Sequence, residues 1–536
     1  MPSAAPTTRA PGRARRAPRL SWALAALGAL AAAALGACDE DAAPEPGAVT
    51  PPPAADASAP DSGGPVVPDG GAPDAAAELA TVGHRRELRA VWVSTAFRLD
   101  FPSATTLTPA QASAELTSIV DVAAAAGQNA IFFQVRAESD ALYTSSLEPW
   151  SRFLSGTQGV SPGYDPLALL VAAAHAKGVE VHAWMNPYRA AVSASAPTAA
   201  GHVSKIYPDA AIAYGGAVTM NPADDRVRSR VLLAVREVTR DYDVDGVVFD
   251  DYFYPYPGAT PFPDDASYDA YVAGGGALGK SDWRRDNVNR LIAATAAAIR
   301  AEKPWVRWGV SPFGIHRPGA PPGVVGLDAY EALACDAPRW LDERWVDYLA
   351  PQLYWTSTSA GQPFGKLVDW WASRATAERP IVPAMGLYRL GTSAEWTREE
   401  YATQIALTRA ASPRTAGAAH FRYASLRDDV AGIQAELAKQ YATPARPPIV
   451  PGAIGTKVAP PGLARAADGS VVVSHSAPAT VRGYAVYRPA GAGWDLARWV
   501  PAATASTTIT LAKGRYAISA IDRAGAESLG AIVDVP

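Results

Sequence analysis

Two adjacent aspartates, Asp250 and Asp251, follow a short apolar segment in the sequence VDGVVFDDY (244–252). A carboxyl group beside a hydrophobic strand can serve as general acid, general base or nucleophile, because burial changes its affinity for protons. Side chains alternate along a strand, so the two carboxyl groups should leave it in opposite directions. With Phe249 packed outward, Asp250 is predicted to point inward. Asp251 either takes part in the chemistry or caps and orients the following loop.

A reaction that uses one carboxyl group as an acid needs a second group as nucleophile or base. The leading candidate elsewhere in the chain is Asp140, followed by Glu138, Asp328 and Asp336. The seven histidines lack HExxH spacing and the two cysteines lack paired-ligand spacing. We therefore predict Asp250, Asp140 and Asp251 as catalytic residues, and neither a metal nor a cofactor.

Other apolar segments also end in polar and aromatic residues. Burying polar groups costs free energy unless they are paired, so these ends are poorly explained by core packing. Aromatic rings stack on the C–H faces of sugars while polar groups bond their hydroxyls, and the pattern therefore indicates a carbohydrate site. The predicted substrate-binding residues are Gln134, Arg136, His182, Trp184, Asn186, Tyr188, Arg189, Tyr252, Tyr254, Phe313, Gln352, Tyr354 and Trp355.

Alternating strands and helices must position these residues. Helical stretches between the strands begin at capping pairs such as Thr108-Pro109 and Asp165-Pro166. Eight such units over residues 85–441 predict a (β/α)8 barrel, in which the strand ends meet on one face. A hydrogen-bonded position inside this barrel is the alternative role for His182. The segments of strand type are 88–95, 129–135, 179–185, 244–250, 306–311, 346–355, 380–388 and 416–423.

Several of these segments resemble the glycosyl hydrolase-like 10 family. The resemblance is carried by ELRAVWVSTAFRLDFPS (87–103), FFQVRAESDALYTSSLEPWSRFLSG (132–156), GYDPLALLVAAAHAKGVEVHAWMNPYR (163–189), DGVVFDDYFYPYP (245–257), WGVSPFGIHRP (308–318) and DYLAPQLYW (347–355). It implies a (β/α)8 glycosidase domain of the bacterial envelope. Characterised relatives include a divisome-localised enzyme that cleaves peptidoglycan glycan strands lacking stem peptides. The residues on family motif positions are Arg136, Asp140, Asn186, Tyr188, Arg189, Asp250, Asp251 and Tyr354.

The segment DGVVFDDY also resembles the chitinase signature DGxDxDxE superficially. When the two are aligned on Asp245-Gly246, Val248 replaces the first inner aspartate and Tyr252 replaces the catalytic glutamate. The acid that a chitinase would use is missing from this strand. We therefore expect no substrate-assisted hydrolysis of the chitinase type.

The N-terminus has the pattern of an export signal. Five arginines precede the apolar run Leu20–Ala37, which ends in Leu35-Gly36-Ala37-Cys38. This resembles a bacterial lipoprotein signal, so residues 1–37 are predicted to be removed and Cys38 to be lipidated, anchoring the protein to a membrane. A plain signal peptide or a single membrane anchor is the alternative. Residues 38–84, poor in large apolar side chains, are predicted to form a disordered tether.

A second, smaller domain follows the barrel. Residues 442–462 are rich in proline and glycine and are predicted to be a linker. Short alternating segments over 463–536 predict an all-β sandwich. The stretch Tyr516–Ser528 resembles the end of a fibronectin type III domain. Trp494 and Trp499 are predicted to lie in the core or on a sheet face rather than to form a sugar platform.

Composition bounds the possible functions. The chain has 536 residues, 49% of them apolar, and a formal net charge of −4. That excludes full-length disorder and gives no basic surface for a nucleic-acid partner. The sequence predicts a lipid-anchored glycoside hydrolase of the bacterial cell envelope, periplasmic or on the outer surface, acting on a glycan and above all on peptidoglycan. The alternatives are a non-catalytic glycan-binding scaffold lipoprotein and a secreted enzyme for an external polysaccharide.

Overall fold

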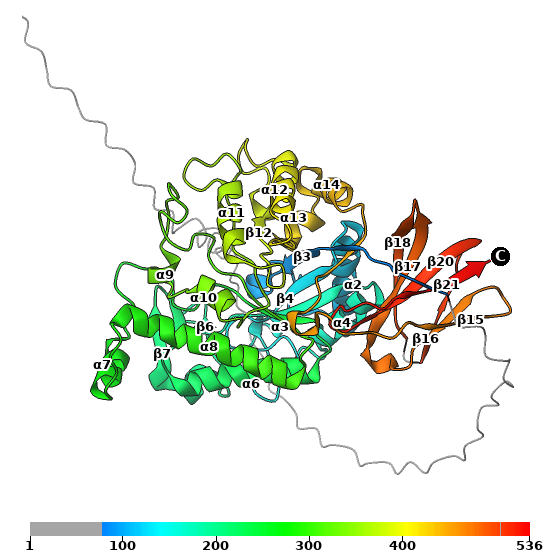
Figure 1. The fold of residues 1–536 in the computed structure, drawn as a ribbon. Helices are drawn as coiled ribbons and strands as arrows, with labels where there is room; N and C mark the ends of the chain where they lie inside the picture. The colour runs from blue at the N-terminus through cyan, green and yellow to red at the C-terminus, as the bar shows by residue number, and fades with distance from the viewer. Residues whose placement is uncertain (1–77, 504) are drawn as a thin grey trace, which may run out of the picture. The chain divides into compact units, whose positions relative to one another are not determined.

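The computed structural model describes residues 78–503 and 505–536 (Figure 1). The predicted signal peptide, the lipidation site Cys38 and the tether up to residue 77 lie outside these described residues. No helix in the described part of the chain is both long enough and apolar enough to cross a membrane.

Eight parallel strands form the central sheet, and each overlaps one of the predicted segments; β4 alone extends past its segment, by the one residue Arg136. The sheet order is β11-β10-β9-β5-β4-β3-β13-β12. Its two end strands are joined by the parallel bridges Leu349↔Ile381 and Gln352↔Ala384, which close the sheet and confirm the (β/α)8 barrel. The strands are β3 (Leu88–Val93), β4 (Ala130–Arg136), β5 (Glu180–Met185), β9 (Gly246–Phe249), β10 (Arg307–Val310), β11 (Tyr348–Leu349), β12 (Ala384–Gly386) and β13 (Gly417–Phe421).

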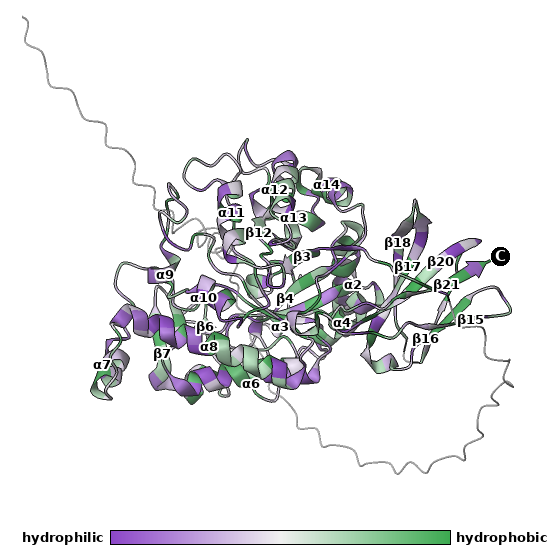
Figure 2. Cartoon of the chain, viewed as in Figure 1, coloured by the Kyte–Doolittle hydropathy of each residue, from purple (hydrophilic) through white to green (hydrophobic). Residues whose placement is uncertain are grey.

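Helices between the strands cover the barrel, and along α8 Figure 2 shows both hydrophilic and hydrophobic stretches. The predicted caps are confirmed at Thr108, which accepts a hydrogen bond from the Gln111 amide, and at Asp165. The third helix begins at Asp225, and Asp224 caps it by accepting a hydrogen bond from the Arg226 amide. The main helices are α2 (Pro109–Ala125), α4 (Pro166–Ala176), α6 (Asp225–Asp241), α8 (Lys280–Glu302), α10 (Ala337–Asp342), α11 (Phe364–Arg374), α12 (Arg398–Ala410) and α14 (Ile433–Gln440).

Alternation along the strands divides the buried residues into two clusters. Ala90, Trp92 and Val248 belong to the cluster inside the barrel. Val247 and Phe249 belong to the larger cluster between the strands and the helices. The inward direction predicted for Asp250, which shares the face of Val248, is therefore confirmed.

Two long insertions follow strands at the mouth of the barrel. After β5, a small antiparallel sheet is formed by β6 (Arg189–Ala191), β7 (Ala211–Tyr214) and β8 (Ala217–Met220). After β9, the aromatic loop from Asp251 leads to α7 (Asp265–Ala273). These insertions enlarge the face of the barrel that carries the predicted site.

The C-terminal strands form two antiparallel sheets, as predicted for a sandwich. Val473, Val486 and Ile518 pack in the core between the sheets. Trp494 and Trp499 pack beside the cluster of Tyr487, which confirms their placement on a sheet face. One sheet has β1 (Leu79–Ala80), β21 (Gly530–Val535), β20 (Gly514–Asp522), β17 (Val481–Ala490) and β18 (Gly493–Pro501), and the other has β15 (Gly462–Arg465), β16 (Val471–Ser474) and β19 (Ser506–Ile509).

The predicted domain boundaries need correction at both ends of the barrel. Leu79–Ala80, predicted to lie in the tether 38–84, pairs with β21 of the sandwich. In the predicted linker 442–462, Ala445–Arg446 forms β14 and pairs with β2 (Arg85–Arg86). Two-residue strands carry no periodicity of their own and are stabilised by partners distant in the sequence, so the sequence pattern could not reveal them.

Gly246 provides a test of packing inside the barrel. A Cβ atom at this position would lie 2.6 Å from Nδ1 of His182, whose buried ring stacks on Phe132. We expect Gly246→Ala to lower the free energy of unfolding by about 1–3 kcal/mol, because the crowded core must shift. Urea unfolding measures this, with Gly201→Ala as control, since a Cβ there meets nothing within 4 Å. Equal stability of the two variants would contradict this packing.

Candidate active site

Asp250 lies directly after β9, with 4% of its surface exposed. Its Oδ2 accepts a hydrogen bond from Trp184 Nε1 at 3.0 Å, and its Oδ1 accepts one from Asn186 Nδ2 at 2.9 Å. Burial raises the pKa of the Asp250 carboxyl, while the nearby Arg189 guanidinium and these two hydrogen bonds oppose the rise. The residue is therefore held in one orientation by groups that favour its charged form.

Asp251 is 1% exposed and has a different set of partners. The Tyr256 hydroxyl donates to its Oδ2, and Gln352 Nε2 donates to its Oδ1 at 3.0 Å. Burial raises the pKa of Asp251 to about 6, the negative charge of Asp250 adds to the rise, and the two hydrogen bonds oppose it. The two carboxyl groups thus turn toward different neighbours, as alternation predicts, yet interact electrostatically. An acid with a pKa near 6 can hold a proton close to neutral pH and release it during a reaction.

Half-buried aromatic residues from five successive loops lie around this pair, and we call them the aromatic rim. Tyr256 contacts both Tyr252 and Phe313, with ring centroids 5.6 Å and 6.2 Å away. Phe313 contacts Trp355 at 5.8 Å. Such rings suit stacking on sugar C–H faces beside the two acids. The aromatic rim comprises Tyr252, Tyr256, Phe313, Tyr354, Trp355, Tyr388 and Phe421.

Asn186 and Arg189 connect the acids to the loop after β5. Asn186 Oδ1 accepts hydrogen bonds from the amides of Tyr188 and Arg189, while its Nδ2 donates to Asp250. The Arg189 guanidinium lies 5.2 Å from the ring centroid of Tyr252 and its Nε donates to the Ala137 carbonyl. A half-buried arginine beside Asp250 places a positive charge where a substrate hydroxyl or carboxylate would meet it.

Gln134 and Arg136 have positioning roles in place of the predicted substrate contacts. Gln134 Oε1 accepts hydrogen bonds from the amides of Thr95 and Ala96, which order the loop after β3. Arg136 forms a two-bond ion pair with Glu148 and donates to the Asn186 carbonyl at 2.6 Å. The hydrogen-bonding atoms of both side chains are thus engaged by neighbouring loops, which they hold in place.

His182, Tyr188 and Tyr254 also need correction as substrate-binding residues. The His182 ring is fully buried, its Nδ1 lies 2.9 Å from the Tyr348 hydroxyl and its Nε2 lies 3.3 Å from Glu180. It therefore takes the alternative role of a hydrogen-bonded residue inside the barrel. Tyr188 and Tyr254 are 0% and 2% exposed and pack in the outer core. The position of a residue at a strand end predicts that it lies near the mouth of the barrel. It does not predict how deeply the loops bury the side chain.

Asp140 belongs to a separate group in the loop after β4. Its side chain has no exposed surface, and its Oδ1 accepts a hydrogen bond from the Glu138 amide. Glu138 in turn pairs with Arg152, its Oε2 lying 2.8 Å from the arginine Nε. The groups that act on Asp140 include Glu138, Ser151 and His202, whereas the carboxyl group that interacts with Asp250 is that of Asp251. The structure therefore brings together Asp250 and Asp251 and places Asp140 in a different group. Asp328, a further candidate for the second acid, caps the short helix α9 (Ala329–Ala332).

Three residues of the aromatic rim were absent from the predicted set. Tyr256 lies in the aromatic stretch YFYPYP (252–257), but only the fold shows that its hydroxyl reaches Asp251. Tyr388 and Phe421 contact each other and Tyr354, at the ends of β12 and β13. Their position after two strands of the barrel was the signal that could have identified them. Among the described residues, no three His, Cys, Asp or Glu side chains are grouped so that they could hold a metal ion.

The raised pKa of Asp251 predicts a pH-dependent change in stability. The pKa of Asp251 in the folded protein, about 6, exceeds that of an unfolded aspartate. The contribution of this group to the free energy of unfolding is therefore fully present at low pH and is lost as the pH rises through 6. The side chain of Asp251→Asn does not titrate. Between pH 4 and pH 8, the free energy of unfolding of this variant should therefore rise relative to that of the wild type by up to about 3 kcal/mol. Urea unfolding across this range measures the difference. The exposed Asp269→Asn serves as control, and a difference independent of pH would contradict the assignment.

Comparison with known proteins places this site within a family. The profile of the glycosyl hydrolase-like 10 family matches residues 87–389. Glycosyl hydrolase YngK of Bacillus subtilis (strain 168) is 34% identical over 436 residues, which cover 77% of this chain and 85% of that protein. Glycosyl hydrolase DigH of Escherichia coli (strain K12) is 33% identical over 326 residues, which cover 57% of this chain and 74% of that protein.

Solved structures are more distant. Alpha-L-fucosidase isoenzyme 2 from Paenibacillus thiaminolyticus has a TM-score of 0.43 and 14% identity; the match covers 66% of this chain and 49%, about half, of the fucosidase. The PgaB (BpsB) glycoside hydrolase domain from Bordetella bronchiseptica has a TM-score of 0.42 and 14% identity, with 66% of this chain and 98% of that domain covered. The family profile and the Bacillus relative each cover more than half of the sequence. The chain therefore belongs to the glycosyl hydrolase-like 10 family.

Proposed function

We propose that the protein is a glycoside hydrolase of the bacterial cell envelope that cleaves glycan strands, above all those of peptidoglycan. The observation that carries this proposal is the pair Asp250–Asp251, in which one buried carboxyl group has a pKa of about 6 beside a second one with different partners. Glycosidic bond hydrolysis by carboxyl groups needs such an acid and such a partner.

In the proposed mechanism, Asp251 is the general acid. It donates its proton to the glycosidic oxygen as the bond to the anomeric carbon breaks, and Tyr256 and Gln352 then stabilise the carboxylate that forms. Asp250, whose charged form accepts hydrogen bonds from Trp184 and Asn186, attacks the anomeric carbon or activates the water that does so. If Asp250 attacks, water then breaks the bond between the sugar and Asp250 and gives its proton to Asp251. If Asp250 activates the water, Asp250 takes the water proton and releases it to solvent, and solvent reprotonates Asp251. No metal is needed for any of these steps.

Three observations of different kinds support hydrolysis of a glycan polymer of the envelope, and the last of them favours peptidoglycan. The relatives YngK and DigH are named glycosyl hydrolases. The aromatic rim provides several ring faces in succession, as a polymer of sugars requires. The predicted export signal and lipid anchor would keep the enzyme in the envelope, where peptidoglycan is the abundant glycan.

Substitution of the two acids tests the proposed chemistry. We expect Asp250→Asn and Asp251→Asn each to reduce the release of glycan fragments from purified sacculi at least about 100-fold, because each removes one catalytic carboxyl group. Asp140→Asn is the matched control, since it changes a buried carboxyl outside the pair and should retain most of the activity. Fragments are counted by chromatography, with sacculi that carry or lack stem peptides.

The same digestion of sacculi also tests the pH dependence of the reaction and the alternative that the protein is a non-catalytic scaffold. The wild-type kcat/KM should fall as the pH rises above about 6, because a general acid must be protonated in the free enzyme. Binding of sacculi by every form without released fragments would instead support a non-catalytic scaffold. Loss of activity in Asp140→Asn with retention in Asp251→Asn would return the catalytic role to Asp140.

The proposed lipid anchor has its own test. In a bacterial host that processes lipoproteins, the wild-type protein should sediment with membranes and incorporate labelled palmitate. Cys38→Ser should lose the label and appear in the supernatant after cell lysis, because the lipid acceptor is gone. Cys335→Ser, at a buried cysteine of the barrel, is the control. A label that persists in Cys38→Ser would exclude this residue as the lipidation site.

A further inference from the structure

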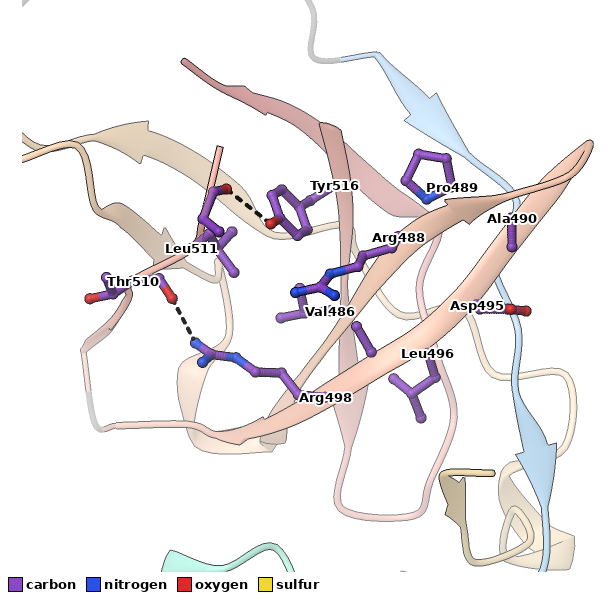
Figure 3. Close-up of a pocket in the computed structure, with 12 residues that line it drawn as sticks. Val486, Arg488, Pro489, Ala490, Asp495, Leu496, Arg498, Thr510, Leu511 and Tyr516 are labelled. Carbon is purple, nitrogen blue, oxygen red and sulfur yellow. Dashed lines mark hydrogen bonds between the residues drawn. The ribbon is translucent and has the colours of Figure 1, made fainter. Parts of the chain in front are cut away.

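The sandwich contains a cavity of about 410 Å³ near the ends of β17 and β18 (Figure 3). Its walls come from these two strands, from the segment 510–512 after β19 and from Tyr516 at the start of β20. A volume of this size falls within the range of small-molecule sites, roughly 300–1,000 Å³. The cavity therefore has room for a sugar residue.

Two arginines occupy positions in this cavity where alternation predicts apolar side chains. Along β17, Tyr484 and Val486 face the core between the sheets, and Arg488 continues the same row. On β18, Arg498 is the register partner of Val486 and so lies on the same face. Both arginines are exposed where this row leaves the core, and Figure 3 shows both extending toward the segment 510–512.

Both guanidinium groups have few partners among the described residues of the protein. Arg498 donates one bond, to the Thr510 carbonyl at 3.2 Å, and Arg488 lies 5.9 Å from the ring centroid of Tyr516. Within residues 78–503 and 505–536, neither arginine forms an ion pair. Asp495 is the cross-strand partner of Arg488, but Figure 3 shows its carboxylate directed away from the guanidinium. With two arginines and one aspartate among its lining residues, the cavity carries a net positive charge, which favours an anionic ligand.

The cavity also has apolar side chains in its walls, beside the polar residues Asp495 and Thr510. Val486, Leu496 and Leu511 line the cavity. The Tyr516 hydroxyl donates a hydrogen bond to the Ala512 carbonyl at 2.9 Å. Apolar walls with a pair of cations at one side match a molecule that has a hydrophobic face and one acidic group. A sugar that carries a carboxylate has this combination, whereas a neutral sugar would leave the guanidinium groups without a partner.

We propose that this cavity binds a carboxylate-bearing sugar unit of a glycan chain through Arg488 and Arg498. The inference rests on the proposed function for the identity of the ligand as a glycan. In peptidoglycan freed of stem peptides, the lactyl group of each N-acetylmuramic acid supplies such a carboxylate. The sandwich then retains the acidic chain on which the barrel acts.

The test uses the full chain with Asp251→Asn, so that glycan is not cleaved during titration. Calorimetry compares peptidoglycan glycan chains without stem peptides, the same chains with methyl-esterified carboxylates, and chitin oligomers of matched length. Adding Arg488→Gln and Arg498→Gln should weaken binding of the acidic chains at least about tenfold, because charge-assisted hydrogen bonds are lost. Binding of chitin and of the esterified chains should not change.

Arg515→Gln is the matched control, because this exposed arginine of β20 pairs with Glu78 and Asp534 and lies outside the cavity. Equal affinity of the double variant and the control for acidic chains would overturn the proposal, as would equal binding of esterified and acidic chains by the wild-type cavity. Release of fragments from sacculi is measured separately with Asp251 intact. If binding depends on the two arginines but no fragments are released, the proposed hydrolase activity is refuted and the proposed binding site is not. If fragments are released but binding does not depend on the arginines, the binding site is refuted and the hydrolase activity is not.

Discussion

Two carboxyl groups that adjoin in the chain and are both buried impose the main constraint on the mouth of this barrel. Buried charges cost free energy unless they are paired or hydrogen-bonded, and two like charges increase that cost. The structure meets the constraint by giving each acid different donors: Trp184 and Asn186 for Asp250, Tyr256 and Gln352 for Asp251. Environments that differ in this way separate the proton affinities of two acids, which is what acid and base roles require.

The donors depend in turn on residues that never reach the mouth. Glu148 fixes Arg136 through two hydrogen bonds, and Arg136 holds the carbonyl of Asn186, whose amide reaches Asp250. On the other side, Gln352 is placed by its bridges to Phe313 and Ala384, where the barrel closes. The orientation of both acids is therefore a consequence of the closed ring of strands and of a buried ion pair, and not of the loops alone.

Much of this arrangement could be predicted from the sequence, because strand alternation is a local property. The eight strands, the inward direction of Asp250 and the cap at Thr108 followed from residue patterns. The depth of Gln134 and Arg136 and the enclosure of Asp140 did not, because loops that fold back over a strand end leave no periodic signal. The same applies to Tyr256, whose contact with Asp251 depends on the path of an aromatic loop.

The two ends of β9 each carry a buried aspartate, but the pKa values of these two residues shift in opposite directions. Asp245, just before the strand, is buried like Asp250, but the effect of burial on its pKa is outweighed by His175 and by Arg482 of the sandwich, and the net shift is downward. Arg482 lies 2.8 Å from Asp245, so this acid stays charged and ties the barrel to the sandwich. At the other end, hydrogen bonds and a more distant arginine leave the pKa of Asp250 raised. One strand thus holds an ion-paired carboxylate with a lowered pKa at its amino end and a carboxyl group with a raised pKa at its carboxyl end, and the difference lies in whether a cation is in direct contact.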